Sequence, residues 1–300
     1  MREDASDNFS YAAPDDPWPK RVLIHAIERV TGQPRLKRLY DDNRAHPVPG
    51  ESFFAAAIRK LDLRVAANEE TLSHWPRTGA LVVVANHPFG VLDGIIICQL
   101  VSKVRGDFRV LTNSVLHRAE EIRSFLLPVD FADTPEALQT NLKTRAEAKA
   151  HLKNGGCIIV FPAGGVATTP GIWQSHATDA EWKTLTARLI QQAQTTVAPV
   201  FFAGQNSRLF QIASHLSMTL RLSLLFKEVH DRMGTELQVR IGEPVPFGEL
   251  AGLSRQDVMR KLREMTYALG ENSARPRTRP AMTVIEGGAA HPGVRSGGPA

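Results

Sequence analysis

The sequence has few cysteines, and this scarcity excludes several classes of protein. Its 300 residues include only Cys98 and Cys157, each in an apolar run, so we expect buried free thiols and no disulfide framework. No Cys-x-x-Cys pair or Cys/His cluster occurs, and we therefore predict no zinc site and no other metal centre. The Gly-x-Ser-x-Gly string of the serine hydrolases is absent as well, which ranks that class of enzyme low.

Long apolar runs are also missing. No segment approaches the roughly 18 consecutive apolar residues of a membrane-spanning helix, and the start MREDASDNFS lacks the features of a secretory signal. We expect a cytoplasmic protein whose contact with a membrane is peripheral, and the net charge of +5 suits an anionic membrane surface. No nucleic-acid partner is expected, because no recognisable binding module occurs and only four Trp and three Tyr are available for stacking.

The overall composition is typical of a globular protein, with 43% hydrophobic and 22% charged residues. Residues 1–19 are acidic and contain three prolines, so we expect a loose segment there. Residues 271–300 carry arginine, proline and glycine with little apolar content and should form a disordered tail. The folded body then covers residues 20–270, with a helical part over 20–75 and an alternating part over 76–270.

Hydrophobic periodicity in this body predicts strands that alternate with helices. The pattern indicates an α/β fold, with a mixed, largely parallel sheet flanked by helices and preceded by a helical N-terminal segment. In the helix predicted over 135–153, Leu138, Leu142, Ala146 and Ala150 share one face. The predicted helices cover 20–31, 34–43, 52–60, 90–104, 135–153, 179–194, 208–227 and 255–269, and the strands cover 81–86, 108–113, 125–131, 157–162, 196–204 and 237–245.

The strongest chemical signal is ANHPFGVLDG, residues 85–94. His87 follows a buried strand in a turn shaped by Pro88 and Gly90, and Asp93 lies six positions later near the start of the next helix. Ligands of α/β sheets bind at the carboxyl ends of strands, and a nearby carboxylate can fix one tautomer of an imidazole and stabilise its charged form. The alternative is a surface histidine followed by an acidic residue that the helix dipole favours.

The segment NHPFGVLD resembles the Asn-His…Asp signature of the glycerolipid and lysophospholipid acyltransferases. That family usually has four residues between His and Asp. Five stand here, a spacing similar to that of a bacterial haemolysin-type subgroup, which includes acyltransferases of ornithine-lipid and other aminolipid synthesis. Further blocks similar to the family's follow in order: VFPAGGVAT at 160–168, VAPVFFAGQNSRLF at 197–210 and IGEP at 241–244.

This resemblance implies direct acyl transfer. His87 would accept the proton of the acceptor hydroxyl while Asp93 orients the imidazole, and the donor would be an acyl-carrier-protein or coenzyme A thioester. No cofactor beyond that co-substrate is implied. The other partners would be a lysolipid acceptor and a membrane surface, on the cytoplasmic face of the bacterial inner membrane. The residues expected to bind substrate are Asn86, Gly90, Arg145, Phe161, Pro162, Gly164 and Gly165.

The sequence departs from the phosphate-handling relatives at two arginine positions. Where their third block reads FPEGTRS, Ala163 and Val166 replace the Glu and the Arg. LPVDF places Phe131 where their second block ends in arginine. Because an arginine fork is the natural partner of phosphate, this double loss favours a lyso-aminolipid, such as lyso-ornithine lipid, as the acceptor.

Two other functions stay open. The chain is a 1-acylglycerol-3-phosphate acyltransferase if Arg123, Lys143 or Arg145 supplies the phosphate site, or it is a non-catalytic haemolysin-like membrane protein. Membrane contact is expected from the basic N-terminal helix or from the apolar stripe over 208–227, although packing on the domain is the commoner fate of such patterns.

Overall fold

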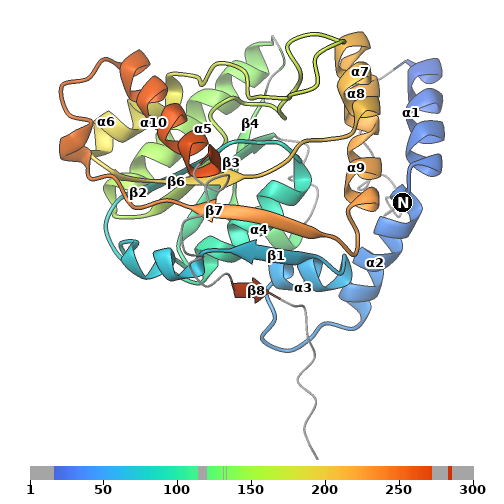
Figure 1. The fold of residues 1–300 in the computed structure, drawn as a ribbon, viewed down its shortest axis with the longest axis horizontal. Helices are drawn as coiled ribbons and strands as arrows, with labels where there is room; N and C mark the ends of the chain where they lie inside the picture. The colour runs from blue at the N-terminus through green and yellow to red at the C-terminus, as the bar shows by residue number, and fades with distance from the viewer. Residues whose placement is uncertain (1–16, 114–119, 131, 133, 272–282, 286–300) are drawn as a thin grey trace, which may run out of the picture.

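The computed structural model describes residues 17–113, 120–130, 132, 134–271 and 283–285 (Figure 1). Most of the segment expected to be loose (1–19), most of the tail expected to be disordered (271–300) and Phe131 lie outside these residues. The described chain forms one mixed sheet with helices on both faces. The predicted α/β class is confirmed.

The sheet has eight strands among the described residues, in the order β4-β3-β5-β2-β6-β7-β1-β8. The strands from β4 to β6 run parallel, whereas β7 is antiparallel to β6, β1 is parallel to β7 and β8 is antiparallel to β1. All of β2 is buried, as expected for a central strand of a sheet covered on both faces. The strands are β1 (Arg64–Ala67), β2 (Leu81–Ala85), β3 (Phe108–Asn113), β4 (Leu126–Val129), β5 (Cys157–Val160), β6 (Thr196–Phe202), β7 (Glu236–Ile241) and β8 (Thr283–Ile285).

Helices form two layers and one end of the molecule (Figure 1). α3 and α4 cover one face of the sheet, α5, α6 and α10 cover the other, and α1, α2 and α7 to α9 stack at one end. The helices are α1 (Trp18–Val30), α2 (Gln33–Ala45), α3 (Phe53–Lys60), α4 (Val91–Ser102), α5 (Pro135–Lys153), α6 (Leu185–Ala193), α7 (Arg208–Leu216), α8 (Met218–Ser223), α9 (Leu225–Asp231) and α10 (Arg255–Glu271), with short 3-10 turns η2 (Glu69–His74), η4 (Glu120–Phe125) and η5 (Phe247–Glu249).

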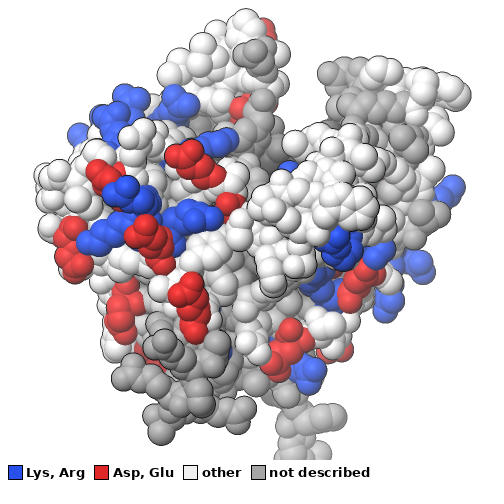
Figure 2. All heavy atoms as spheres, turned by 45° about the horizontal axis from the view of Figure 1, so that its top comes forward, with Lys and Arg blue, Asp and Glu red and all other residues white. Residues whose placement is uncertain are grey.

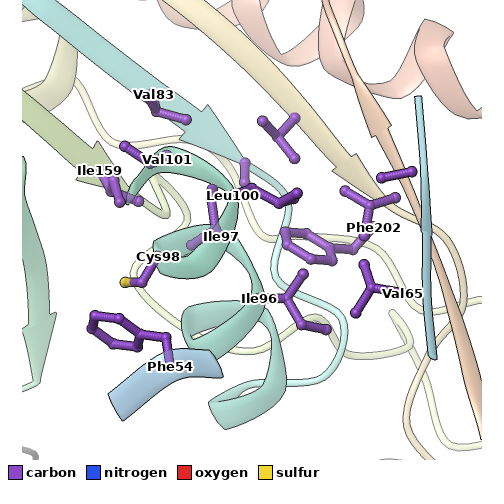
Figure 3. Packing of buried hydrophobic residues seen from close by; sticks show 14 of the residues in the cluster. Phe54, Val65, Val83, Ile96, Ile97, Cys98, Leu100, Val101, Ile159 and Phe202 are labelled. Carbon is purple, nitrogen blue, oxygen red and sulfur yellow. The ribbon is translucent and has the colours of Figure 1, made fainter. Parts of the chain in front are cut away.

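Apolar side chains form the core beneath α4 (Figure 3). Ile97 and Val101 of α4 pack toward Val83 and Ile159 of the sheet. Cys98 of the same helix is a buried free thiol, and so is Cys157 of β5, which confirms the expectation for both cysteines. Burial raises the pKa of each thiol, to about 12 for Cys157, so neither is a ready nucleophile near neutral pH.

Three predicted segments differ from the structure. The helix expected over 179–194 begins only at Leu185, the first residue of α6. Residues 64–67 form β1, a strand of the main sheet, inside the part of the chain that we expected to be helical. The long helix expected over 208–227 is divided into α7, α8 and α9, because Ser217 between the first two is extended, with φ −162° and ψ 134°. None of these segments contains a proline or glycine that would have indicated the difference.

The helix α5 has its predicted bounds, but its leucine face is turned to solvent. Leu138 and Leu142 are 58% and 55% exposed, whereas Ala137, Ala148 and Leu152 are buried against the sheet. Both sets of residues have helical spacing, so periodicity alone does not decide between them.

This arrangement predicts a difference between two identical substitutions on one helix. Leu152→Ala should lower the free energy of unfolding by about 2–5 kcal/mol, because it leaves a cavity in a packed core. Leu142→Ala should change that free energy by less than about 0.5 kcal/mol. Urea unfolding followed by circular dichroism measures both, and equal losses would contradict the placement of α5.

Candidate functional site

The turn that carries His87 is fixed at the end of β2 by Asn86. The buried Asn86 amide donates from Nδ2 to the Phe202 carbonyl (2.9 Å), and its Oδ1 accepts from the Phe202 N–H (2.7 Å). These two bonds extend the β2–β6 pairing by one residue through a side chain. The backbone is therefore held rigidly at the position where His87 follows the sheet.

His87 and Asp93 meet across this turn. His87 Nδ1 lies 3.0 Å from Asp93 Oδ2, and the side chains of His87 and Asp93 are 17% and 0% exposed. The same oxygen accepts the backbone N–H of Phe89 (2.8 Å) and of Gly90 (2.9 Å). Asp93 thus caps the start of α4 and also holds the imidazole, so the capping role does not exclude the catalytic one.

Gly90 is required by the geometry of the turn. Its φ is +73°, and a Cβ placed on it would come within 3.1 Å of both Leu225 and Val166. A side chain at this position would therefore be strained and crowded. The neighbouring Phe89 is buried, its ring fills the space beside Gly204, and the Arg232 guanidinium lies 4.5 Å above it.

Burial affects the ionisation of Asp93. Loss of solvent raises the pKa of Asp93, and the bonds from His87, Phe89 and Gly90 act in the opposite direction. Asp93 Oδ1 has no hydrogen-bond partner among the described residues, which adds to the cost of its charge. The ionised carboxylate is therefore placed to stabilise positive charge that develops on the imidazole during a reaction.

The far side of the imidazole rests on the segment that follows β5. The Phe161 ring stacks on His87 with 4.0 Å between ring centroids and 25° between planes. The Ala167 N–H donates to the His87 carbonyl at 2.7 Å. Phe161 of the third block therefore contacts the dyad, as Asn86 and Gly90 do.

Asp179 is a further acidic residue at the site, and no sequence motif had indicated it. Its Oδ1 accepts the His87 backbone N–H (3.1 Å), and its Oδ2 accepts the Trp182 indole N–H (2.9 Å). Burial raises the pKa of Asp179, as it does for Asp93. The contact joins residues that are far apart in the chain, and no spacing rule would have indicated it.

The remaining predicted site residues form two groups, one in the turn beside the dyad and one apart from it. Gly164, with φ +74°, turns the chain after Pro162, whose carbonyl accepts the Lys183 N–H (2.9 Å). A Cβ on Gly164 would lie 2.9 Å from Lys183 Nζ, so this turn is covered by Lys183. Gly165 continues the turn toward Val166, which lies beside Gly90.

Arg145 lies apart from these residues. It is exposed on α5 and lines a cavity of about 320 Å³ with Asp130, Lys183 and other residues. No hydrogen bond or ion pair in the described part of the chain joins it to His87 or Asp93. Arg123 and Lys143 are exposed as well, and Lys143 pairs with Glu147 at 3.8 Å. No three His, Cys, Asp or Glu side chains gather as metal ligands would, within the residues that the structure describes.

Several known proteins resemble this chain. The model of the family described as Acyltransferase matches residues 41–274. A lyso-glycine lipid O-acyltransferase of Phocaeicola vulgatus is 24% identical over 237 residues, which cover 76% of this chain and 80% of the relative. An enzyme of the same name from Bacteroides thetaiotaomicron is 24% identical over 243 residues, with 76% and 82% covered. Among solved structures, the 1-acyl-sn-glycerophosphate acyltransferase PlsC of Thermotoga maritima gives a TM-score of 0.49 at 17% identity, over 89% of this chain and 87% of that one.

The buried carboxyl at the site predicts a pH-dependent effect of Asp93→Asn. Because burial raises the folded-state pKa of Asp93 above its usual value of 3.8, the stability that this group provides is present at low pH and is lost as pH rises through the raised pKa. Asparagine does not titrate. The unfolding free energy of the variant minus that of the wild type should therefore increase from about pH 4.5 to about pH 8.

Urea unfolding of both proteins at the two pH values measures this difference. A difference that instead falls as the pH rises would mean that the three donors to Asp93 outweigh its burial.

Proposed function

The chain belongs to the acyltransferase family, and from that premise we propose that it transfers a fatty acyl chain from a thioester donor to the hydroxyl of a lyso-aminolipid. Transfer of an acyl group to a lysolipid is supported by the family match and by the two O-acyltransferase relatives. The observation that carries the proposal at this site is the His87–Asp93 pair at the carboxyl end of β2.

His87 acts as the general base in this mechanism. Its Nδ1 is engaged by Asp93, and its Nε2 has no hydrogen-bond partner among the described residues. Nε2 takes the proton of the acceptor hydroxyl as that oxygen attacks the thioester carbonyl carbon. The tetrahedral intermediate then collapses, the carbon–sulfur bond breaks, and the imidazolium returns its proton to the leaving thiolate. The products are an ester and a free thiol.

Asp93 stabilises the imidazolium and fixes its orientation. The buried carboxylate is a stronger partner for a cation than an exposed one would be, because water screens the pair less. The Phe89 and Gly90 N–H groups already bond to Asp93 and are not available for the developing oxyanion. We assign that role to other backbone N–H groups of the α4 start or of the turn at 161–167.

The acceptor is proposed to be a lyso-aminolipid because of two observations. The two relatives are named for a lyso-glycine lipid, although at only 24% identity. Val166, which stands where phosphate-handling relatives carry an arginine, packs against Gly90 beside the dyad. A phosphate monoester with nearly two negative charges would be costly to bury against such a surface. An amino-acid head group with one carboxylate brings less negative charge to this surface and is less costly to bury there.

A competition assay tests this function. Purified protein, one acyl thioester and equal amounts of lyso-ornithine lipid, lyso-glycine lipid and lysophosphatidic acid should yield mainly acylated aminolipids. His87→Ala should lower the rate by at least ~10²-fold, since loss of a general base typically costs ~10²–10⁴-fold. Its unfolding should resemble that of the wild type, because His87 lies outside the apolar core. Preferential acylation of lysophosphatidic acid would favour the 1-acylglycerol-3-phosphate acyltransferase alternative.

The membrane-surface location is proposed from an apolar patch at one end of the molecule. Within the described chain, no helix is long and apolar enough to span a bilayer. Large apolar side chains are nevertheless exposed on α1, on α7 and α8, and on the loop that Arg208 ties to α7 through the Ile172 and Gln174 carbonyls. The patch consists of Trp18, Val22, Ile172, Trp173, Leu209, Ile212, Leu216 and Met218.

Figure 2, which turns the top of Figure 1 toward the viewer, shows a broad white surface between areas where charged side chains gather. Trp173 is 93% exposed and Leu216 is 67% exposed, and large apolar side chains that gather in one patch mark interaction sites. Basic residues such as Arg21 and Arg208 lie on the same elements and suit anionic lipid head groups. We propose that this patch rests on the cytoplasmic face of the inner membrane.

Vesicle binding tests the patch. Trp173→Ser and Leu216→Ser should each weaken binding to anionic vesicles by about tenfold or more, because burying one such side chain contributes ~1.5–3 kcal/mol. Val48→Ser, a change of an exposed apolar residue near α3, is the matched control and should leave binding unchanged. Binding by the wild type should weaken as salt is added. Attachment that survives both high salt and alkali would contradict this mode.

A further inference from the structure

Arg221 of α8 is a partly buried cation that points at the active-site loop. Its Nη2 donates to the Val166 carbonyl at 2.5 Å and lies 3.6 Å from the position of a Cβ on Gly165. The guanidinium also lies 5.9 Å from the centre of the Phe210 ring. The side chain therefore reaches from the helical end of the molecule to the glycine turn of the third block.

The charge of Arg221 lacks a carboxylate among the described residues. Other well-buried guanidinium groups have one: Arg232 bonds to Glu228 at 2.8 Å, and Arg105 bonds to Asp107 at 2.7 Å. A guanidinium carries five N–H donors, of which the described contacts of Arg221 use one, on a carbonyl. Burial lowers the pKa of Arg221, and no neighbouring acid opposes that effect.

The apolar surroundings of Arg221 make the absence of a carboxylate partner energetically unfavourable. Phe210, Leu224 and Leu225 form a small apolar cluster, and Val166 packs against it. A cation in such a place is stabilised by an anion more than an exposed one would be, because little water competes for it. The free protein therefore presents a cation whose natural partner is absent from the described chain.

This cation lies close to the reacting groups. The residue whose carbonyl it contacts, Val166, packs beside Gly90 of the dyad turn. The next residue, Ala167, donates its N–H to the carbonyl of His87. Arg145, the cation that the sequence suggested for a head group, has no such connection to the dyad. Recognition of the head group by Arg221 and recognition by Arg145 are therefore two different hypotheses.

We propose that Arg221 binds the head-group carboxylate of the lysolipid acceptor and so selects for an amino-acid head group with a free carboxylate. The inference rests on the proposed lyso-aminolipid function. One guanidinium matches the single negative charge of a carboxylate and can bond to both of its oxygens. Arg221 thus holds a cation over the carbonyl of the residue that replaces the arginine of the phosphate-handling relatives.

The experiment compares lyso-glycine lipid with its carboxyl methyl ester as acceptors. Wild-type protein should acylate the free acid with a kcat/KM about 10- to 100-fold higher than that of the ester, the range expected for a hydrogen bond to a charged group. Arg221→Gln should lose most of this preference, mainly through a higher KM for the acid. Arg221→Lys should restore part of it, because the charge is kept without the fork.

Arg260→Gln is the matched control, since Arg260 is exposed on α10 and pairs with Asp257. It should keep the wild-type ratio of acid to ester. Arg221→Met suits the apolar surroundings and replaces the glutamine variant if that variant does not fold. A merely structural role for Arg221 would lower both rates together and leave the ratio unchanged.

The outcomes separate the two proposals. If the wild type acylates the acid but the Arg221 variants keep its preference over the ester, the role of Arg221 is overturned while the function stands. Equal wild-type rates on the acid and the ester would likewise overturn the role of Arg221 and leave the proposed function standing. If the wild type leaves lyso-glycine lipid unmodified, the proposed acceptor is wrong, and the carboxylate role of Arg221 falls with it.

Discussion

One oxygen atom organises the site: Oδ2 of Asp93 accepts the N–H groups of Phe89 and Gly90 and contacts Nδ1 of His87. The backbone bonds begin α4 and close the turn after β2, while the contact with His87 orients the imidazole. Local structure and chemistry therefore depend on the same buried group. The fold sustains this charge because α4 is anchored by an apolar core behind it (Figure 3). The stabilising contacts of that core offset the unfavourable burial of the carboxylate.

Much of this arrangement could be predicted from the sequence. The run LVVVA, the turn residues Pro88 and Gly90 and the acidic residue Asp93 are local signals, and local signals predict strands, turns and helix starts well. The central strands and α5 therefore match their predicted positions closely. The pairing of His87 with Asp93 follows from the short loop between them.

What the sequence could not predict depends on contacts between distant segments. Asp179 reaches the His87 backbone only because the long segment after β5 folds back over the turn. Arg221 contacts Val166 from α8, a helix that begins after the break at Ser217. Leu142 has the spacing of a core residue and is exposed, since the sheet lies against another face of α5. In each case the deciding factor is tertiary packing, which a pattern of neighbouring residues does not predict.

The strand β1 has a consequence for biosynthesis. Among the described strands it pairs with β7 and β8 alone, and both are encoded more than half a chain later. At ~5–20 residues per second, a ribosome takes on the order of ten seconds or more to deliver β7 after β1 has emerged. During that interval Val65, Ala66 and Ala67, all buried in the finished protein, form an apolar strand with unpaired backbone groups. The nascent chain therefore carries an early segment that chaperones can shield, and the sheet is completed only near the end of translation.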